Sequence, residues 1–442
     1  MKLSTLLRSA ALALIATTTA FAAPPAEPPG PVPTAAAGIR HVFIILLENK
    51  SYDDTFGSST QDPYLQKTLV SQGALLTQYY GTGHVSLDNY LSLISGQAPT
   101  RDTANDCMPA LAAGGAQYTD VRQTGWAAQG QVVASAGCVY GRDVPTLPGQ
   151  LEAAGLSWRG YMQDMGNDPA RAAASCGHPV PGGPDTAASA EGRSASVPEG
   201  DAYATRHNPF VYFHSIIDDK AGCARHVVNL DKLPADLARV RSTPNLVFIT
   251  PNLCSDGHDG SGTGAPGTTC ANGQPGGLTS IDAFLRTWVP RIMASPAFRR
   301  DGLLIISFDE SNFTVHQSMG AGDQMQVDIT FPGKTCCDQR PGPNLADARP
   351  GGVTLVDTPR MRERLVIEGY GGDRIGAVLL SPFIRQGSTS DTPYNHYSLL
   401  RSIEDIFHLR HLGYAADDAA SHYHLDTIGA DGRVFLPAAT VH

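Results

Sequence analysis

A serine at the start of a short helical pattern is the first residue here that could do chemistry. Apolar side chains recur at helical spacing over residues 86–94, and the pattern stops at Gly96. Ser86 would then lie where free backbone N–H groups and the helix dipole favour an anion, as an attacking alkoxide requires. The alternative is an ordinary serine that caps its own helix, which is the commoner arrangement. Ser86 is therefore a candidate nucleophile that needs support from elsewhere in the chain.

Acidic and amide side chains directly follow two apolar runs. Glu48 and Asn49 come after the first run, and Asp309 and Glu310 come after a later one. Carboxylate and amide oxygens are the ligands that hard or borderline divalent cations prefer. Solvated turns are the alternative for each pair, but both pairs follow runs typical of buried strands. We therefore expect a metal site that draws on both.

Two further places carry side chains that could ligate a metal or act on a leaving group. Asn252, Asp256 and His258 follow a third apolar run, with the acid and the histidine two residues apart. A glycine-rich turn is the alternative there, since glycines alternate through residues 260–264, although the D-x-[DN]-x-[DN]-G pattern of a calcium loop is absent. His396 begins the last long helical pattern, where it could cap the helix or belong to the site.

Four short apolar runs must position these side chains. The runs are continuous rather than alternating, as expected for strands buried on both faces of a parallel sheet that helices cover. Ligands bind beyond the carboxyl ends of such strands, so the polar residues that follow the runs should converge on one site. The runs occupy residues 41–47, 246–250, 303–308 and 377–380, and further helical patterns lie at 281–293 and 396–409. The predicted fold class is α/β.

The N-terminal residues indicate export. Residues 1–22 have the charged start, the apolar centre and the A-x-A ending of a cleaved signal, and residues 23–38 form a Pro- and Ala-rich linker. A single domain is expected over residues 39–442, with insertions near 165–200 and near 313–372, the second without sustained periodicity. The predicted localisation is periplasmic or secreted, and no later run is long enough to be a transmembrane segment.

Eight cysteines agree with export, because an even number of cysteines in an oxidising compartment favours disulfides. A thiolate zinc site would need a C-x2-C pair, and the sequence has none. Proximity suggests the pairs Cys107–Cys138 and Cys254–Cys270. The adjacent cysteines 336 and 337 are expected to pair elsewhere rather than with each other.

The charge balance bears on the partner. The 442 residues include 32 Lys and Arg against 42 Asp and Glu, a formal net charge of −10, and no basic run occurs. A nucleic-acid-binding protein normally carries a basic patch, so nucleic acid is not an expected partner. With 42 % hydrophobic residues the chain can bury a large core.

Several motifs, in order along the chain, resemble those of the bacterial phosphoesterase family. Residues 47–57 (LENKSYDDTFG) resemble the ENxSFDxxFG opening of that family, and residues 84–90 (HVSLDNY) continue the likeness. Further matching motifs occupy residues 207–210, 250–254, 308–310, 374–376 and 394–405. The family contains secreted acid phosphatases and phospholipases C and is related to the alkaline phosphatase superfamily. The resemblance implies a three-layer α/β/α sandwich with a mostly parallel central sheet and loop insertions near the active site.

The resemblance also implies a metal centre. Glu48, Asn49, Asp309 and Glu310 would bind a divalent ion (Ca, Mg, Mn or Zn), and Ser86 would be both the nucleophile and a further ligand. The serine alkoxide and the phosphate would then share the charge of one cation.

Phosphate-binding residues follow from the same resemblance. Asn89 would donate its amide to a phosphate oxygen, and Asn49 would also contact the phosphate. Val85 and Asp88 depart from the family, which usually has proline at both places, and Asp88 puts a carboxylate close to the phosphate. The remaining candidates for the active site are His84, His207, Asn252, Asp256, His258 and His396.

The predicted activity is that of an exported, metal-dependent phosphomonoesterase of acid-phosphatase type with a phosphoseryl intermediate. A phospholipase C acting on phospholipid headgroups is the alternative; the lack of an obvious lipid-binding module favours small phosphate esters as substrates. A non-catalytic surface binding protein is a further alternative, which the complete set of candidate residues disfavours.

Overall fold

The computed structural model describes residues 36–107, 117–185, 187, 200–265, 268–345, 351–416 and 425–437. The predicted signal and the linker up to residue 35 lie outside this part of the chain. Parts of both predicted insertions lie outside it as well.

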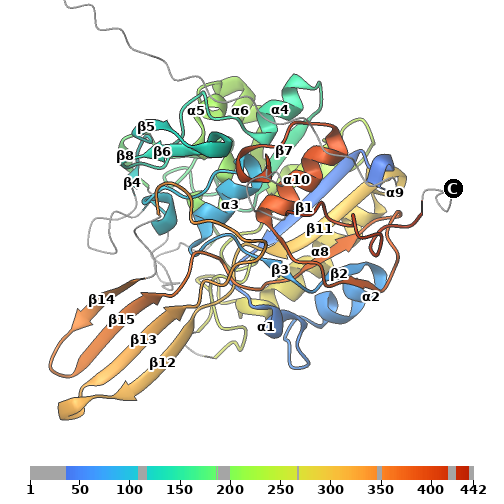
Figure 1. The fold of residues 1–442 in the computed structure, drawn as a ribbon. Coiled ribbons are helices and arrows are strands. Elements are labelled where there is room, and N and C mark those ends of the chain that lie inside the picture. The colour runs from blue at the N-terminus through green and yellow to red at the C-terminus, as the bar shows by residue number, and fades with distance from the viewer. Residues whose placement is uncertain are drawn as a thin grey trace, which may run out of the picture.

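An eight-stranded sheet forms the centre of the protein (Figure 1). All of its strands run parallel to one another except β16, which is antiparallel to both of its neighbours. Across the sheet the strands are β17 (Ser388–Ser390), β2 (Ala74–Leu76), β16 (Ala377–Leu380), β11 (Gly302–Phe308), β1 (His41–Leu47), β10 (Leu246–Thr250), β7 (Trp158–Met162) and β9 (Val227–Asn229). The mostly parallel sheet predicted from the sequence is confirmed.

The four apolar runs are strands β1, β10, β11 and β16, and every residue in them is buried. One expectation about them was wrong. Strand β16 runs against the others, so its carboxyl end at Ser381 lies at the opposite edge of the sheet from Glu48 and Asp309. The chain leaves β11 at the edge that carries these acids and returns to the sheet from the same side, which makes β16 antiparallel to β11.

Helices cover both faces of the sheet (Figure 1). Helices α3 (Ser86–Ser95), α4 (Leu147–Ala153) and α10 (His396–Phe407) contact one another, and α8 (Gly277–Ala294) contacts α9 (Pro296–Asp301). Alternate residues of the strands face the two layers. Leu303 and Ile305 line a small cavity with α10, whereas Phe43, in register with Leu304, contacts Phe298 of α9. The predicted three-layer α/β/α sandwich is confirmed.

Shorter helices complete the two layers: α1 (Tyr52–Phe56), α2 (Val70–Gln72), α5 (His214–Ile217), α6 (Lys220–His226) and α7 (Leu233–Asp236). The three helical patterns predicted from the sequence correspond to α3, α8 and α10. Helix α3 ends as predicted at Gly96, whose φ of 66° lies in the left-handed region that glycine tolerates. None of the described helices is both long enough and apolar enough to cross a bilayer.

A second sheet, which we call the arm, projects from the body (Figure 1). Its strands, in order across the sheet, are β12 (Thr314–Met319), β13 (Met325–Phe331), β15 (Met361–Ile367) and β14 (Gly351–Asp357). The arm lies within the predicted insertion at residues 313–372. The sequence interpretation missed its alternation of apolar and polar residues, which has the period of two that strands require.

Four disulfides join all eight cysteines: Cys107–Cys138, Cys176–Cys223, Cys254–Cys270 and Cys336–Cys337. The two pairs suggested by proximity are confirmed. The expectation for Cys336 and Cys337 was wrong, because the other six cysteines pair among themselves and these two bond to each other.

Candidate active site

The site is built around Glu48, which directly follows β1 and is fully buried. One carboxylate oxygen, Oε2, accepts a hydrogen bond from the Ser86 hydroxyl at 2.9 Å. The other, Oε1, accepts one from the Tyr90 hydroxyl at 2.5 Å. Ser86 and Tyr90 are four residues apart on α3 and therefore share the face of the helix that meets the end of β1.

Ser86 is the first residue of α3, and it does not cap its own helix. The N-cap position belongs to Val85, and no side chain caps this end. The Ser86 hydroxyl is instead directed at Glu48, and its residue is only 3 % exposed. The arrangement therefore differs from the capping serine that the sequence left open. It leaves Ser86 at the positive end of a ten-residue helix, where negative charge is stabilised.

His207 and Asp256 lie against the same carboxylate. The His207 Nε2 atom is 3.4 Å from Glu48 Oε1, and its Nδ1 atom is 3.2 Å from Asp256 Oδ2. Neither contact has the geometry of a hydrogen bond, since His207 Nε2 and Asp256 Oδ2 are buried without a hydrogen-bond partner. One ligand atom from each of Glu48, His207 and Asp256 lies within 4.8 Å of the other two. Such a buried group could hold a metal ion.

Asp309, which follows β11, is the third carboxylate of this group. Its Oδ1 atom accepts hydrogen bonds from the backbone N–H groups of Asn49 at 3.1 Å and of Glu310 at 2.6 Å. Its Oδ2 atom is buried and has no hydrogen-bond partner. Strands β1 and β11 pair in register up to Leu47 and Phe308, so Glu48 and Asp309 emerge side by side. This juxtaposition agrees with the predicted convergence at the strand ends.

Burial and mutual repulsion act on the carboxylates of the cluster. Burial raises the pKa of Glu48 well above its usual range, and the charges of Asp309 and Asp256 raise it further. Burial also raises the pKa of Asp256 and of Asp309. For His207, burial and the positive charge of Arg206 lower the pKa, which favours the neutral imidazole that ligates metals. Three crowded acids and one neutral imidazole favour occupation by a cation.

Glu310, also predicted as a metal ligand, belongs to a neighbouring cluster. The His84 ring lies between two carboxylates: Nδ1 contacts Glu310, and Nε2 is 2.9 Å from Asp373 Oδ2. Burial alone would lower the pKa of His84, but the two carboxylates raise it to about 9. The Asp373 carboxylate also accepts hydrogen bonds from the backbone N–H groups of Gly333 and Lys334, at the base of the arm. In the structure the Glu310 carboxylate therefore pairs with the His84 ring and does not join the carboxylate cluster around Glu48.

Asp373 was not singled out from the sequence. It stands directly before the motif at residues 374–376, a few residues ahead of β16. Because β16 is antiparallel, its amino end reaches the edge of the sheet where the parallel strands end. An acid that precedes a strand is thereby brought beside acids that follow strands. The motif was a signal for Asp373, but the assumed direction of β16 concealed it.

The side chain of Asn89 holds the loop that leads into α3. Its Oδ1 atom accepts hydrogen bonds from the backbone N–H groups of Thr82 at 2.8 Å and of Gly83 at 3.0 Å. Its Nδ2 group donates to the carbonyls of Gly83 at 2.9 Å and of Val85 at 3.0 Å. Both ends of the amide are thus engaged within the protein. The expected contact between Asn89 and a phosphate stays a prediction.

Asn49 and Lys50 lie beside a polar cavity of about 380 Å³. The Asn49 Oδ1 atom is buried without a hydrogen-bond partner, so this oxygen retains the capacity to bind a cation. The Lys50 ammonium donates to the backbone carbonyls of Asn49 at 3.0 Å and of Gly257 at 2.7 Å. It thereby ties the segment after β1 to the segment after β10. Lys50 was not singled out from the sequence, although it lies within the motif at residues 47–57.

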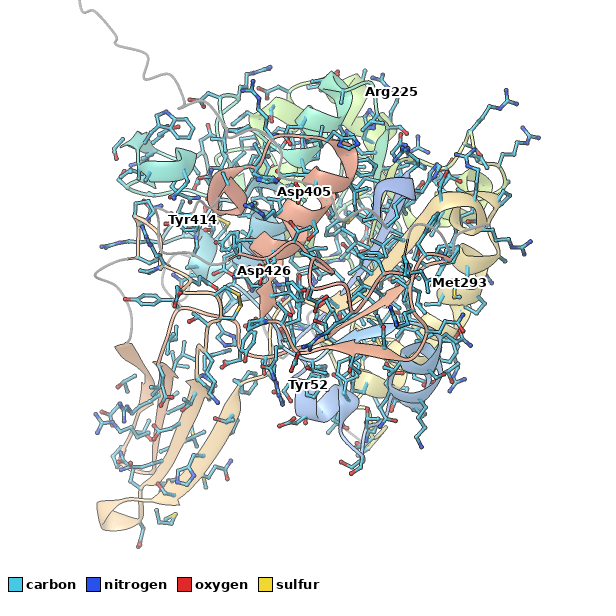
Figure 2. The ribbon with its side chains drawn as sticks, turned by 45° about the vertical axis from the view of Figure 1, so that its right-hand side comes forward. Tyr52, Arg225, Met293, Asp405, Tyr414 and Asp426 are labelled. Atoms are coloured by element: carbon cyan, nitrogen blue, oxygen red, sulfur yellow. A yellow bond between two sulfur atoms is a disulfide. The ribbon has the colours of Figure 1, made fainter. Side chains whose placement is uncertain are left out.

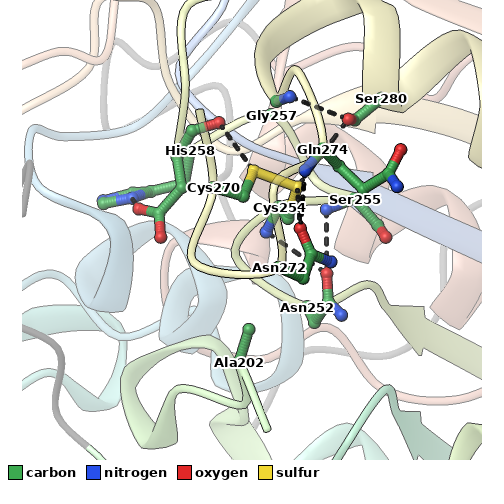
Figure 3. The surroundings of a disulfide bond; sticks show 12 residues. Ala202, Asn252, Cys254, Ser255, Gly257, His258, Cys270, Asn272, Gln274 and Ser280 are labelled. Atoms are coloured by element: carbon green, nitrogen blue, oxygen red, sulfur yellow. Dashed lines mark hydrogen bonds and ion pairs between the residues drawn. A yellow bond between two sulfur atoms is a disulfide. The ribbon is translucent and has the colours of Figure 1, made fainter. Parts of the chain in front are cut away.

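Asn252 shapes the turn that leads to Asp256. Its Oδ1 atom accepts from the backbone N–H groups of Cys254 at 3.2 Å and of Ser255 at 2.8 Å, next to the Cys254–Cys270 disulfide (Figure 3). Its Nδ2 group donates to Asp164 Oδ2 at 2.6 Å. Asn252 therefore lies in the loop that carries the site rather than in the carboxylate cluster.

His258 lies behind His207. Its ring is 5.8 Å from the His207 ring, its Nε2 atom is 3.0 Å from Arg206 Nη2, and its Nδ1 atom is 2.9 Å from Asp259 Oδ1. Both ring nitrogens are thus engaged by neighbours. These contacts fit a residue that positions His207. Separately, the backbone carbonyl of Asp256 accepts a hydrogen bond from the Glu48 backbone N–H at 2.9 Å.

His396 contacts the backbone of Asp309. Burial lowers the pKa of His396 to about 4, so its ring is neutral at physiological pH. Tyr79 lies 3.1 Å from Nδ1, and Nε2 lies 2.6 Å from the Asp309 carbonyl oxygen. A neutral ring that accepts from Tyr79 and donates to Asp309 satisfies both contacts. The helix cap itself is formed by Asn395, so His396 is not the cap that the sequence left open.

The site thus gathers buried acids, a histidine and a serine at a helix N-terminus where parallel strands end, which is where α/β enzymes bind their ligands. The chain belongs to the Phosphoesterase family, whose family model matches residues 59–410. The resemblance drawn from the motifs is thereby confirmed. The matched range contains most of the site residues but begins after Glu48 and Asn49.

Acid phosphatases are among its relatives. The chain is 23 % identical over 288 residues to an acid phosphatase of Aspergillus fumigatus, covering 64 % of this chain and 48 % of the relative. It is 23 % identical over 389 residues to a probable acid phosphatase of Kluyveromyces lactis, covering 87 % of this chain and 62 % of the relative. The chain thus spans between 48 % and 62 % of the length of these curated relatives.

A solved structure of a protein in the alkaline phosphatase superfamily from Vibrio parahaemolyticus is also similar. It is 11 % identical, with a TM-score of 0.45, over 90 % of this chain and 72 % of that chain.

Proposed function

We propose that this protein is a metal-dependent phosphomonoesterase of acid-phosphatase type with Ser86 as its nucleophile. The observation that carries the proposal is the 2.9 Å hydrogen bond from the Ser86 hydroxyl to Glu48 inside a cluster of buried acids. Membership of the Phosphoesterase family and the acid phosphatases among the relatives support the reaction class.

The donor set fits a divalent cation. Glu48, Asp256, Asp309 and His207 would hold it, and two of their oxygens together with one ring nitrogen are buried without hydrogen bonds. Carboxylates favour Mg, Ca or Mn, and an imidazole among them also admits Zn. When bound, the cation would offset the charge of the acids and lower the cost of forming the serine alkoxide.

The residues of the chain divide the remaining work. Ser86 releases its hydroxyl proton to water, attacks the phosphorus and forms a phosphoserine. The P–O bond to the substrate alcohol breaks, and the departing alkoxide takes a proton from water. Water then attacks the phosphoserine, releases inorganic phosphate and restores the hydroxyl. The N-terminus of α3 stabilises the negative charge that develops beside Ser86. We assign Oδ1 of Asn49, which is buried without a hydrogen-bond partner, to the cation, and the Nδ2 group of the same amide as a donor to the phosphate.

We further propose that the protein works outside the cytoplasm. Its described residues contain four disulfides and no free cysteine, which is the usage expected in an oxidising compartment. A cleaved signal at residues 1–22 would deliver it there. Fractionation of cells that express the full chain tests this directly, and activity confined to the cytoplasm would contradict it.

A substrate panel tests the proposed activity. Purified protein is assayed with p-nitrophenyl phosphate, with bis(p-nitrophenyl) phosphate and with phosphatidylcholine vesicles, each with and without chelator. We expect the monoester to be turned over fastest and chelator to abolish its turnover. Faster release of phosphocholine would instead identify a phospholipase C. Absence of turnover with every substrate after metal loading would favour a binding protein.

A further inference from the structure

The arm has two chemically different faces, which the strand registers define. Val315 lies opposite Ile329, Ile329 lies opposite Leu365, and Leu365 lies opposite Val353. Residues that lie opposite each other in neighbouring strands point to the same side of a sheet. The side chains of Val315, Ile329 and Leu365 therefore form an apolar row across strands β12, β13 and β15. A second row nearer the tip consists of Met319, Met325 and Met361.

Alternation along each strand extends these rows to a complete surface, which we call the apolar face. Its members are Phe313, Val315, Met319, Met325, Val327, Ile329, Phe331, Val356, Met361, Leu365 and Ile367. Gln317 and Glu363 are the two polar residues among them, and both lie level with Val327.

The opposite face of the arm is polar. It carries the ion pairs Arg364–Asp328 at 3.7 Å and Arg362–Asp357 at 3.8 Å. Sheets with one apolar and one polar face normally bury the apolar one against a second layer of structure. In the described part of the chain the arm projects away from the body, and beyond its base its side chains stand apart from those of the body (Figure 2).

Part of the apolar face is exposed to solvent. Among the described residues six large hydrophobic side chains are exposed, and five of them belong to the arm or its base. Four of the five are members of the apolar face: Phe313 at 46 %, Val315 at 51 %, Met319 at 64 % and Met325 at 43 %. The fifth, Leu355 at 38 %, lies at the irregularity between Thr354 and Val356 and is not one of its members. The remaining members of the face are half-buried. Isolated exposed apolar residues are normal on proteins, but a contiguous patch of this kind marks an interaction site.

The size and chemistry of the face fit a second copy of the same chain. Three of its strands have seven residues and the fourth has six, so the face measures roughly 23 by 19 Å. Two such faces pressed together would remove on the order of 1,000 Å² of accessible surface, the lower limit for a specific interface. Apolar sheet faces pack readily on one another about 10 Å apart, and a two-fold dimer uses the same patch twice.

A lipid surface fits the face less well. Glu363 lies within it, with Gln317 at the same level, and a carboxylate that enters hydrocarbon is costly. Between two protein surfaces such a group can be hydrated or hydrogen-bonded instead. The arm also lacks the cluster of basic residues that anionic lipids attract, because Asp323, Asp328, Asp357 and Glu363 offset its arginines.

We propose that the protein forms a homodimer in which the apolar faces of two arms pack against each other. The interface begins beside the active site, since the Phe331 ring at the base of the face lies 4.7 Å from the His84 ring. The dimer is independent of the proposed activity, and its test uses a physical measurement rather than turnover.

Sedimentation equilibrium of the full mature chain, with its disulfides intact, tests the proposal from about 0.1 to about 100 µM. The test variant carries Met319→Lys and Met325→Lys, two exposed side chains that lie opposite each other on the apolar face. The matched control carries Ser318→Lys and Gln326→Lys, which lie opposite each other one position away on the polar face of the same two strands. Both variants add the same charge to the same hairpin.

We expect the wild type to dimerise, the apolar-face variant to raise the dissociation constant by about tenfold or more, and the control to stay within about twofold. Circular dichroism checks that both variants are folded. We expect this result because Ser318, Met319 and Met325 are exposed and Gln326 is only half-buried. A wild type that is monomeric at about 100 µM would overturn the proposal. So would an equal effect of the two variants, or binding of the wild-type monomer to phosphatidylcholine vesicles that only the apolar-face variant loses.

Discussion

The hydroxyl of Ser86 and the carboxylate of Glu48 are joined by a 2.9 Å hydrogen bond across 38 residues of sequence. Both groups are buried, and neither belongs to a local turn. The contact exists because β1 ends, and α3 begins, at the same edge of the sheet. A buried hydroxyl beside a buried acid is poised for deprotonation when a cation shares the site.

Removal of this hydroxyl provides the first prediction. Ser86→Ala should lower kcat by about 10³-fold or more, because water alone must then attack the phosphorus. The variant should stay folded and still bind vanadate or inorganic phosphate, since the acids and the helix N-terminus remain. Ser95→Ala, at the other end of α3, is the matched control, because the Ser95 hydroxyl donates to the Leu91 carbonyl and accepts from the Gln97 backbone N–H, away from the site. A Ser86→Ala enzyme that retains more than about a tenth of wild-type turnover would show that Ser86 is not the nucleophile.

The second prediction concerns the metal. Glu48→Gln and Asp309→Asn each remove one formal charge from the cluster without changing its shape, so metal content and activity should fall together. Elemental analysis of the purified proteins measures the metal content, and a chelator should reproduce the loss of activity in the wild type. Glu404→Gln is the control, because Glu404 is also a fully buried acid but lies in α10 away from the cluster. Wild-type protein that holds no divalent ion and resists chelator would contradict the proposed centre.

The four buried strands and the convergence of the acids could be predicted because both depend on short-range patterns. Continuous apolar runs mark buried strands, and polar residues at their ends mark the edge of the sheet that binds ligands. Glu48 and Asp309 were located in this way. The same reasoning could not reveal Asp373, since the direction of β16 depends on where the chain returns from the arm, and no local pattern records that path.

It was harder to predict which group each buried polar side chain contacts than to predict which part of the protein it lies in. Glu310 follows a strand just as Asp309 does, yet successive residues at the end of a strand point in different directions, and Glu310 meets His84. Asn89 is three residues from Ser86 on a helix, which puts both near one face, but the loop preceding α3 takes up its amide. Spacing fixes which residues can meet, whereas loop geometry decides which of them do.

The third prediction separates two roles for Asn89. If this amide mainly holds the loop of residues 82–85, Asn89→Ala should destabilise the protein by about 2–4 kcal/mol, because several buried backbone groups lose their partners. Activity should fall with it, through displacement of Ser86. Urea unfolding and phosphate inhibition are measured on the same preparation. A variant with wild-type stability and weakened phosphate inhibition would show instead that Asn89 binds the phosphate.

The last prediction concerns Asp62, a buried acid outside the site. Its Oδ1 atom accepts a hydrogen bond from the Leu65 backbone N–H at 3.0 Å, and its Oδ2 atom is buried without a hydrogen-bond partner. Burial raises the pKa of this carboxyl from 3.8 to about 8. Between these two values the folded chain holds a proton that the unfolded chain has released. The free energy of unfolding should therefore fall as pH rises toward 8, by at most about 1.4 kcal/mol per pH unit from this group.

Asp62→Asn keeps the acceptor for Leu65 and removes the titration, so this variant should lose less stability than the wild type between pH 5 and pH 9. Urea unfolding at several pH values, with the disulfides intact, measures the difference. Asp231→Asn, which removes a charge from an exposed position, should leave the slope of the wild type unchanged. Both variants remove one carboxylate, but only Asp62 is buried. If the free energy of unfolding of Asp62→Asn and of the wild type changed with pH in parallel, the Asp62 carboxyl would already be ionised in the folded protein.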